Sequence, residues 1–336
     1  MRILADYHHA DLYESLCILF EDRMGWEVYR PAGLGWHEQG LWKYSDNPAV
    51  ARQFLETPLA GAVNAGPYYE FPEVPNPRKH RLVTVEQSRQ LKWDFLLGSV
   101  TQHERLWSRL ARDIGAKFIY QVGNIGQPVD WSLDPLVLCS SSLPIQGRGV
   151  YYHPEFSLKD YNFNDTTPAP QKIITNFMNC LPATSTPYQE WCKLQELLPD
   201  FTFLEYGILG KDGIVGPSSR IAEKMRASGW AYHSKPHGDG YGFVIHQWAA
   251  VGRPMIGRSA AYRPCVAHYF WERDGGPYPL DLDRTSIEEV AETIRRVTAD
   301  PAEYARACQA ANARFRDKVD FAAEAQRAQA FFEQHR

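Results

Sequence analysis

The sequence predicts an α/β fold with two Rossmann-like lobes that face a central cleft. Strand-like and helix-like segments alternate twice, first over residues 2–139 and then over residues 172–256. Residues 161–171, between the two series, are rich in Asn, Asp, Thr and Pro, the composition of a linker. The length of 336 residues also fits two domains, at roughly 100–200 residues for each. These observations favour two lobes of similar size over one large domain.

The first lobe opens with a strand, a helix and a second strand. Residues 2–7 include a short apolar run, and leucines recur at helical spacing from Leu12 to Leu19. Gly25 is placed to stop this helix, and residues 26–31 resume a strand-like pattern. This order of elements favours parallel strands.

The rest of the first lobe is regular only after an irregular segment. Six prolines interrupt residues 32–82, which we expect to form an insertion or an elaborate loop region. Apolar patterns then predict a strand at 93–97, a helix at 101–114, and strands at 117–122 and 136–139. These segments extend one doubly wound sheet.

The second lobe repeats the alternation and ends in helices. The expected strands are 172–177, 201–206, 230–233 and 253–256, and the expected helices are 187–198, 218–228 and 243–251. After Thr285 the chain is helical, with one apolar face made by Ile287, Val290, Ala291, Ile294 and Val297. We therefore divide the chain into an N-terminal Rossmann-like lobe, a C-terminal Rossmann-like lobe and a terminal helix that can pack back on the first lobe: 1–165, 166–318 and 319–336.

Composition and charge exclude several classes of protein. The net charge of -4 gives no large positive field, so binding of nucleic acid would need a local basic patch. No run of about 18 apolar residues is present, and Asp6 lies where a signal peptide would be apolar, so we expect a soluble cytoplasmic protein with no membrane insertion. The six cysteines lie far apart without zinc-site spacing, which favours buried thiols and no metal site.

The most informative stretch is residues 235–256. It is expected to run from a strand end through a glycine-rich turn into a helix, a short turn and a strand. The unpaired N–H groups at the start of such a helix form a cradle for an anion. Gly240 and Gly242 can adopt positive φ and let the backbone approach a phosphate, although helix entries also use glycine for plain geometry.

This stretch resembles the donor-site segment of glycosyltransferases with the two-lobed GT-B architecture, similar to families 4 and 1. In that group an acidic residue, Gly, an aromatic and Gly open a helix, and a second acidic residue follows eight positions after the first. Asp239, Gly240, Tyr241 and Gly242 match the opening, whereas Gln247 takes the place of the second acid. The resemblance implies a nucleotide sugar as co-substrate, with no other cofactor and no metal.

The resemblance also implies roles for individual residues. The second carboxylate of the family typically binds the donor ribose, which the uncharged amide of Gln247 can still hold. The family often places an Arg and a Lys after the first strand of the second lobe, but residues 174–179 contain neither, so Lys235, Lys211 or Arg258 would have to substitute. The expected donor-binding residues are Lys235, Gly240, Tyr241, Gly242, His246 and Gln247, with Asp239 assigned to catalysis.

A second group of polar residues lies between the first strand and the first helix. His8 and His9 are flanked by Asp6 and Asp11, at a strand edge where α/β lobes concentrate ligand groups. One of the two histidines can act as general base on an acceptor hydroxyl, with a carboxylate fixing its tautomer. Asp11 can instead cap the helix that contains Glu14. We assign His8 and His9 to catalysis, with neither favoured.

A basic helix face raises the question of a nucleic-acid acceptor. Arg105, Arg109 and Arg112 share one face of the expected helix, and residues 78–81 add a basic cluster upstream. A solvated helix face is the default interpretation of such a pattern. If both clusters flank the cleft, they can hold a phosphate backbone.

The leading hypothesis is therefore a hexosyl- or pentosyltransferase that moves a sugar from a nucleotide sugar, such as a UDP-sugar, to an acceptor. The C-terminal lobe, 166–318, would bind the nucleotide sugar, and the N-terminal lobe, 1–165, would bind the acceptor. The donor-site motif resembles retaining rather than inverting members. The alternatives are a non-catalytic nucleotide- or sugar-binding protein and a glycosyltransferase whose acceptor is modified DNA. A dinucleotide oxidoreductase is disfavoured, because no Gly-x-Gly-x-x-Gly follows the first strand.

Overall fold

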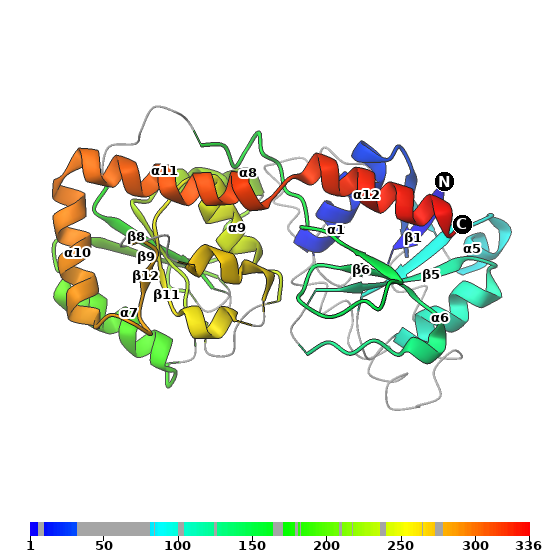
Figure 1. The fold of residues 1–336 in the computed structure, drawn as a ribbon, viewed down its shortest axis with the longest axis horizontal. Coiled ribbons are helices and arrows are strands. Elements are labelled where there is room, and N and C mark those ends of the chain that lie inside the picture. The colour runs from blue at the N-terminus through cyan, green and yellow to red at the C-terminus, as the bar shows by residue number, and fades with distance from the viewer. Residues whose placement is uncertain are drawn as a thin grey trace. The chain divides into compact units, whose positions relative to one another are not determined.

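The chain folds into two compact units. Unit 1 comprises Met1–Phe156 together with Phe321–Arg336, and unit 2 comprises Ser157–Asp320 (Figure 1). The computed structural model describes residues 1–5, 10–31, 81–83, 85–99, 104–123, 126–163, 171–178, 181, 183–207, 210–216, 218–235, 240–263, 265–272 and 278–336. The irregular segment predicted over 32–82 therefore falls almost entirely outside the described residues.

Unit 1 is built on a parallel sheet. Its strands are β1 (Arg2–Ala5), β2 (Glu27–Pro31), β3 (Arg81–Val83), β4 (Phe95–Gly98), β5 (Lys117–Val122), β6 (Leu136–Cys139) and β7 (Gly149–Tyr151). Their order is β3-β2-β1-β4-β5-β6-β7, and every neighbouring pair is parallel. The chain proceeds from β1 to β2 and β3, then returns to the opposite side of β1 with β4. The strand order therefore reverses between β1 and β4.

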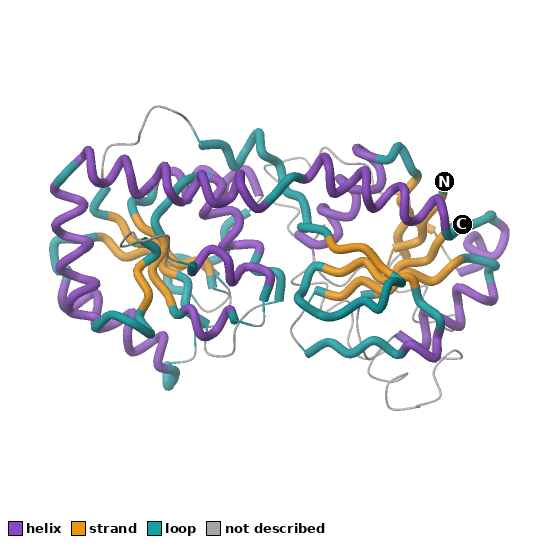
Figure 2. The backbone as a smooth tube through the Cα atoms, viewed as in Figure 1, coloured by secondary structure: helices purple, strands orange, loops and turns teal. Residues whose placement is uncertain are grey.

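Helices cover both faces of this sheet (Figure 2). The described helices of unit 1 are α1 (Ala10–Cys17), the π-helix η1 (Ile18–Arg23), α5 (Val85–Gln90), α6 (Glu104–Asp113), the 3-10 helix η5 (Trp131–Leu133) and α12 (Phe321–Gln334). Side chains alternate along β4, where Phe95 and Leu97 pack with α1, η1 and α12, and Leu96 packs with α6. Because both faces of the sheet are buried, the sequences of these strands are continuous apolar runs.

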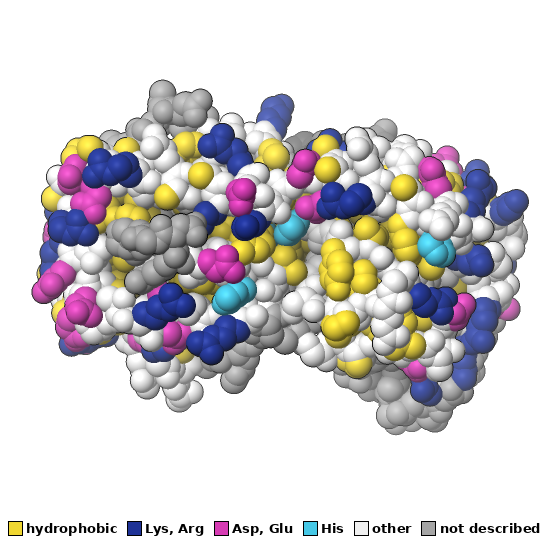
Figure 3. All heavy atoms as spheres, in the orientation of Figure 1, with side chains coloured by type: hydrophobic (Ala, Val, Ile, Leu, Met, Phe, Trp, Pro, Cys, Tyr) yellow, Lys and Arg dark blue, Asp and Glu magenta, His cyan; other side chains and the backbone are white. Residues whose placement is uncertain are grey.

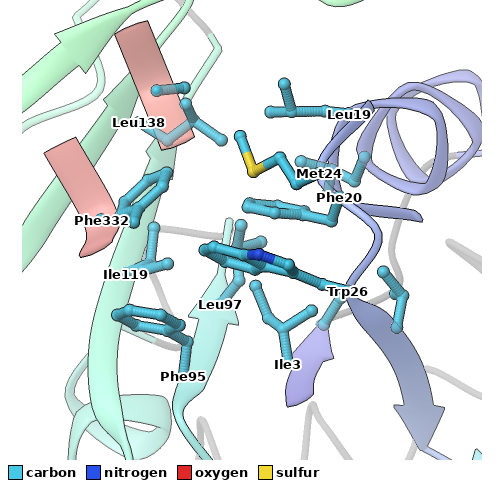
Figure 4. Close-up of a cluster of buried hydrophobic side chains, with 14 of the residues drawn as sticks. Ile3, Leu19, Phe20, Met24, Trp26, Phe95, Leu97, Ile119, Leu138 and Phe332 are labelled. Atoms are coloured by element: carbon cyan, nitrogen blue, oxygen red, sulfur yellow. The ribbon is translucent and has the colours of Figure 1, made fainter. Parts of the chain in front are cut away.

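An aromatic cluster joins the last helix of the chain to the first strands. Trp26 stacks between Phe20 and Phe95, with ring centroids 5.2 and 5.3 Å away, and Phe332 of α12 lies 5.7 Å from Phe95 (Figure 4). Buried aromatic pairs of this kind contribute through both apolar area and ring geometry. The C-terminal helix is thus part of the core of unit 1.

Unit 2 has a second parallel sheet. Its strands are β8 (Ile173–Phe177), β9 (Thr202–Tyr206), β10 (Trp230–Tyr232), β11 (Met255–Gly257) and β12 (Leu280–Asp281). Their order is β12-β11-β10-β8-β9, with parallel pairing throughout. The chain goes from β8 to β9 on one side and then returns to the other side of β8 with β10. The reversal therefore falls between β8 and β10, as it falls between the corresponding strands of unit 1.

The helices of unit 2 pack on both faces of its sheet. They are α7 (Thr186–Leu197), α8 (Ser218–Ala227), α9 (Phe243–Ala250), α10 (Ile287–Ala299), α11 (Pro301–Lys318) and the 3-10 helices η6 (Ser259–Tyr262) and η7 (Val266–Trp271). The predicted apolar face of α10 is confirmed, because Val290, Ala291 and Ile294 are buried against Trp191 of α7 in one cluster. The short strands β7 and β12 were not predicted, since two or three residues carry no readable period.

A buried carboxyl group begins helix α6 in unit 1. Glu104 is 4% exposed, and its Oε1 accepts a hydrogen bond from the backbone N–H of Asp130 at 3.0 Å. Burial raises the pKa of Glu104 from its usual 4.5 to about 7, because the ionised form loses its hydration; the Asp130 N–H opposes this shift in part. The folded protein therefore binds a proton at Glu104 more tightly than the unfolded chain does.

Replacing Glu104 by Gln should make the protein more stable at alkaline pH. The native pKa of Glu104 lies above the unfolded value, so the contribution of this group to stability is fully present below pH 4.5 and is lost as the pH rises through about 7. Glu104→Gln keeps the acceptor for Asp130 and removes this loss, a gain of up to about 3 kcal/mol at pH 8. Denaturant unfolding at pH 5 and pH 8 measures the difference. Glu292→Gln, on an exposed position of α10, is the control, and equal gains for both variants would contradict the assignment.

Candidate functional site at the carboxyl edge of unit 2

The glycine turn predicted before α9 has a left-handed backbone at its last residue. Gly242 is the N-cap of α9, with φ 79° and ψ 52°. A residue with a side chain rarely adopts this backbone conformation, and a Cβ at Gly242 would also lie 3.4 Å from the Cβ of Ala267. The first peptide N–H groups of α9 point out of the amino end of the helix, as in any α-helix. Local geometry by itself therefore favours glycine at position 242.

The turn lies at the edge of the sheet where ligands of open α/β folds collect. In parallel sheets ligands bind beyond the carboxyl ends of the strands, where the strand order reverses. In unit 2 this place is between β8 and β10, and His233, Ser234 and Lys235 follow β10. Asn176, near the end of β8, has no exposed surface. Its Oδ1 accepts the N–H of Met178 at 3.0 Å, whereas its Nδ2 has no hydrogen-bond partner in the described part of the chain.

An unsatisfied buried amide is costly, so Asn176 indicates a place for a polar ligand. Asn176 is not among the site residues expected from the sequence. The available signal was an amide at the end of an otherwise apolar strand, residues 173–177.

The sequence suggests three cationic residues that could neutralise a phosphate at this edge: Lys235, Lys211 and Arg258. Their surroundings differ. Arg258 follows β11, and its guanidinium is held by Glu190 and by Asp283, with 2.6 Å between Nη1 and Asp283 Oδ1. The hydrogen bond to Glu190 raises the pKa of Arg258, so its charge is already compensated by two carboxylates. Lys211 is exposed in the turn after β9, at the far end of the sheet from β12. Lys235 is half-buried three residues after the end of β10, on a strand that borders the reversal, and is the best placed of the three.

Two side chains of α9 that the sequence assigned to donor binding are buried. Gln247 is 5% exposed, and its side-chain amide makes no hydrogen bond within the described part of the chain, although its carbonyl accepts the N–H of Val251. His246 has no exposed surface, and its ring stacks on that of Tyr241 with centroids 4.1 Å apart. The Nδ1 of His246 lies 2.9 Å from the carbonyl oxygen of Gly242, and its Nε2 lies 2.6 Å from the hydroxyl of Tyr269. Gln247 thus has unused hydrogen-bonding capacity, whereas both nitrogens of His246 face protein atoms.

The residues assigned to catalysis lie outside the described part of the chain. This holds for His8 and His9, which follow β1, and for Asp239, which precedes Gly240. Their roles remain predictions from the sequence.

Neither a metal centre nor a membrane span is found among the described residues. No three His, Cys, Asp or Glu side chains there are grouped so that they could hold a metal ion. None of the helices described is long and apolar enough to cross a bilayer. The described cysteines, Cys17, Cys139, Cys192, Cys265 and Cys308, are free thiols.

The basic face of α6 is partly neutralised. Arg105 is exposed and pairs with Asp130, with 3.1 Å between Nη2 and Oδ2, while Leu106 and Leu110 are buried on the opposite side as predicted. Charged side chains of both signs are interspersed over the visible face of unit 2 (Figure 3). The pair with Asp130 lowers the positive charge that this face of α6 offers to a phosphate backbone, and residues 78–80 of the upstream cluster lie outside the described residues.

Comparison with solved structures shows which known architecture the chain resembles. No protein-family model and no curated protein matches the sequence. Anabaena HepE in complex with UDP-glucose aligns over 99% of this chain and 100% of its own, with a TM-score of 0.61 and 11% identity. An α-glucosyltransferase in complex with UDP-glucose and DNA containing an abasic site aligns over 99% of both chains, with the same score and identity. A glycosyltransferase from Rickettsia africae ESF-5 aligns over 99% of this chain and 98% of its own, with a TM-score of 0.60 and 10% identity.

The chain has the GT-B fold. These likenesses span both units, and they confirm the α/β fold with two Rossmann-like lobes that the sequence predicts. At 10 to 11% identity they establish the fold and leave the activity to be argued from the site.

Replacing Gly242 by Ala should destabilise the turn that opens α9. The left-handed backbone costs a residue with a Cβ about 1–2 kcal/mol. Gly213→Ala is a matched control, because Gly213 has φ 76° and open space around it but lies in the turn after β9. Both variants should lose similar stability in denaturant unfolding. Only Gly242→Ala should speed hydrogen exchange of the Ile245 and His246 amides, which bond to the Gly242 carbonyl. Equal exchange in both variants would contradict this role.

Proposed function

We propose that the protein is a glycosyltransferase that transfers a hexosyl group from a nucleotide sugar, with UDP-glucose as the first donor to test. The observation that carries the proposal is the carboxyl edge of unit 2, where the strand reversal, the glycine turn before α9 and the unsatisfied amide of Asn176 come together. Such an edge suits a diphosphate with attached hydroxyl groups. The UDP-glucose complexes of two proteins with the same fold support the choice of donor.

Each group of the donor has a candidate partner in unit 2. The N–H groups that open α9 are suited to the diphosphate, because the helix end carries partial positive charge. Lys235 adds a full charge beside them, and the Nδ2 of Asn176 offers a neutral donor. Gln247 lies one turn into α9, where its amide can hold a ribose hydroxyl. Backbone and amide donors thus replace the Arg and Lys that the family often places after the first strand.

The reaction forms one bond and breaks one bond. An oxygen of an acceptor hydroxyl bonds to the anomeric carbon, and the bond from that carbon to the β-phosphate oxygen breaks. The leaving nucleoside diphosphate keeps the electron pair, and the hydroxyl proton passes to a base or to the leaving phosphate. Donors aimed at the diphosphate lower the barrier by stabilising the charge that develops on it. The donor-site motif favours retention of the anomeric configuration.

Incubation with UDP-glucose and a panel of other nucleotide sugars tests the proposal. A donor that binds only the folded state raises the melting temperature by mass action. Addition of hydroxyl-bearing acceptors should then release free nucleoside diphosphate. Binding without release in any acceptor mixture would favour the non-catalytic binding protein, and no stabilisation by any nucleotide sugar would exclude both functions.

Replacing Lys235 by Met should weaken UDP binding, and Lys211→Met should not. A hydrogen bond to a charged group contributes about 1.5–3 kcal/mol, so the dissociation constant should rise by roughly 10- to 150-fold for Lys235→Met. The two variants remove the same charge from the same unit. Calorimetric titration with UDP at two salt concentrations measures the effect, and equal affinities would show that Lys235 does not contact the phosphates.

Replacing His8 or His9 by Ala should lower turnover more than nucleotide affinity. A general base contributes typically 10²–10⁴-fold to a rate, whereas neither residue belongs to unit 2, which we propose binds the nucleotide. Initial rates over a pH series, combined with UDP titrations, separate the two effects. Full activity in both single variants would remove the histidines from the mechanism.

A further inference from the structure

The imidazole of His246 is enclosed by aromatic rings and engaged at both nitrogens. The ring of Tyr241 stacks on it, and the ring of Phe270 meets it edge-on with centroids 4.9 Å apart. Its Nδ1 faces the carbonyl oxygen of Gly242, and its Nε2 faces the hydroxyl of Tyr269 in η7. No atom of His246 is exposed, and both ring nitrogens already face protein atoms.

The partners of the ring determine which nitrogen carries the hydrogen. A carbonyl oxygen can only accept, so the Nδ1 of His246 carries a hydrogen and donates it to Gly242. In the neutral ring Nε2 is then an acceptor, and the hydroxyl of Tyr269 donates to it across 2.6 Å. Tyr269 therefore selects the tautomer that bonds to the glycine turn.

We propose that His246 is a positioning residue that fixes the left-handed peptide at Gly242, and that Tyr269 orients it. Three N–H groups converge on the Gly242 carbonyl: the backbone groups of Ile245 and His246, at 3.0 and 3.2 Å, and the imidazole Nδ1 at 2.9 Å. The carbonyl of an N-cap normally accepts only from the backbone. The added bond holds the peptide plane that directs the opening N–H groups of α9. Because Tyr269 lies in η7, this segment and the glycine turn are coupled through one ring.

The importance of this bond for ligand binding rests on the proposed function. An anion bound by backbone N–H groups is sensitive to small rotations of their peptide planes, because hydrogen bonds weaken steeply as they bend. A side chain that locks the Gly242 peptide should therefore act on nucleotide affinity without touching the nucleotide.

Nitrogen-15 NMR of the histidine side chains tests the tautomer without any ligand. The wild type should show the His246 ring with hydrogen on Nδ1, and Tyr269→Phe should shift the Nε2 signal while the ring remains packed. A ring with hydrogen on Nε2 alone would overturn the proposal, because it could not donate to Gly242.

Three substitutions at His246 separate its two bonds. In His246→Asn the side-chain amide reaches the position of Nδ1 and can still donate to Gly242, whereas His246→Gln reaches toward Tyr269 and His246→Leu makes neither bond. UDP affinity should fall less than about threefold for Asn and about tenfold or more for Leu and Gln, the effect of one lost buried hydrogen bond. Hydrogen exchange of the Ile245 amide should accelerate in the same order. Equal effects of Asn and Leu would overturn the proposal.

Tyr269→Phe provides the test if His246→Leu does not fold. It removes one hydroxyl and keeps the ring, so UDP affinity should fall by about three- to tenfold. Tyr304→Phe is the matched control, because it removes a buried hydroxyl that donates to the carbonyl of Gly229, away from the glycine turn. Equal affinities for the two Phe variants would overturn the coupling. If the wild type binds no UDP, the proposed function fails, while the tautomer and the Ile245 exchange rate still decide the positioning role.

Discussion

The reversal of strand order between β8 and β10 is the constraint on which the proposed site depends. Both strands end at the same edge, but the chain continues from β8 to β9 on one side and from β10 to β11 on the other, so the connections separate and leave the carboxyl edge lined by strand ends. Asn176, Ser234 and Lys235 occur at that edge for this reason, although they are distant in the sequence. Helix α9 also begins from this edge, because it follows the carboxyl end of β10. One topological feature thus collects every donor in the proposed site.

The chemistry of this edge relies more on neutral donors than on free charge. Arg258 carries a charge at the end of β11, but Glu190 and Asp283 compensate it, so it is a structural group that ties β11 to α7 and to the segment after β12. We propose that Lys235, the Asn176 amide and the N–H groups that open α9 bind the anionic ligand instead. Such donors act at fixed positions, which explains why the peptide at Gly242 is held by a buried histidine as well as by the helix.

The buried polar groups of unit 1 have structural roles. Glu104 is buried with one hydrogen bond, at a cost that rises with pH, and the aromatic cluster around Trp26 includes Phe332 from the end of the chain. Glu324 reinforces this attachment, because its carboxylate lies 2.7 Å from the Nδ1 of His153, which follows β7. The stability of unit 1 therefore depends on a helix that the chain makes last.

The sequence by itself determined the alternation of strands and helices, because apolar period and glycine or proline stops are local properties. It also located the glycine turn, whose residues are contiguous. It could not find the unsatisfied amide of Asn176, the neutralisation of Arg258 or the Tyr269 partner of His246, because these depend on contacts between residues 23 to 68 positions apart or on burial. Tertiary structure decided them because only the packed sheet defines which polar groups lose water and which find partners.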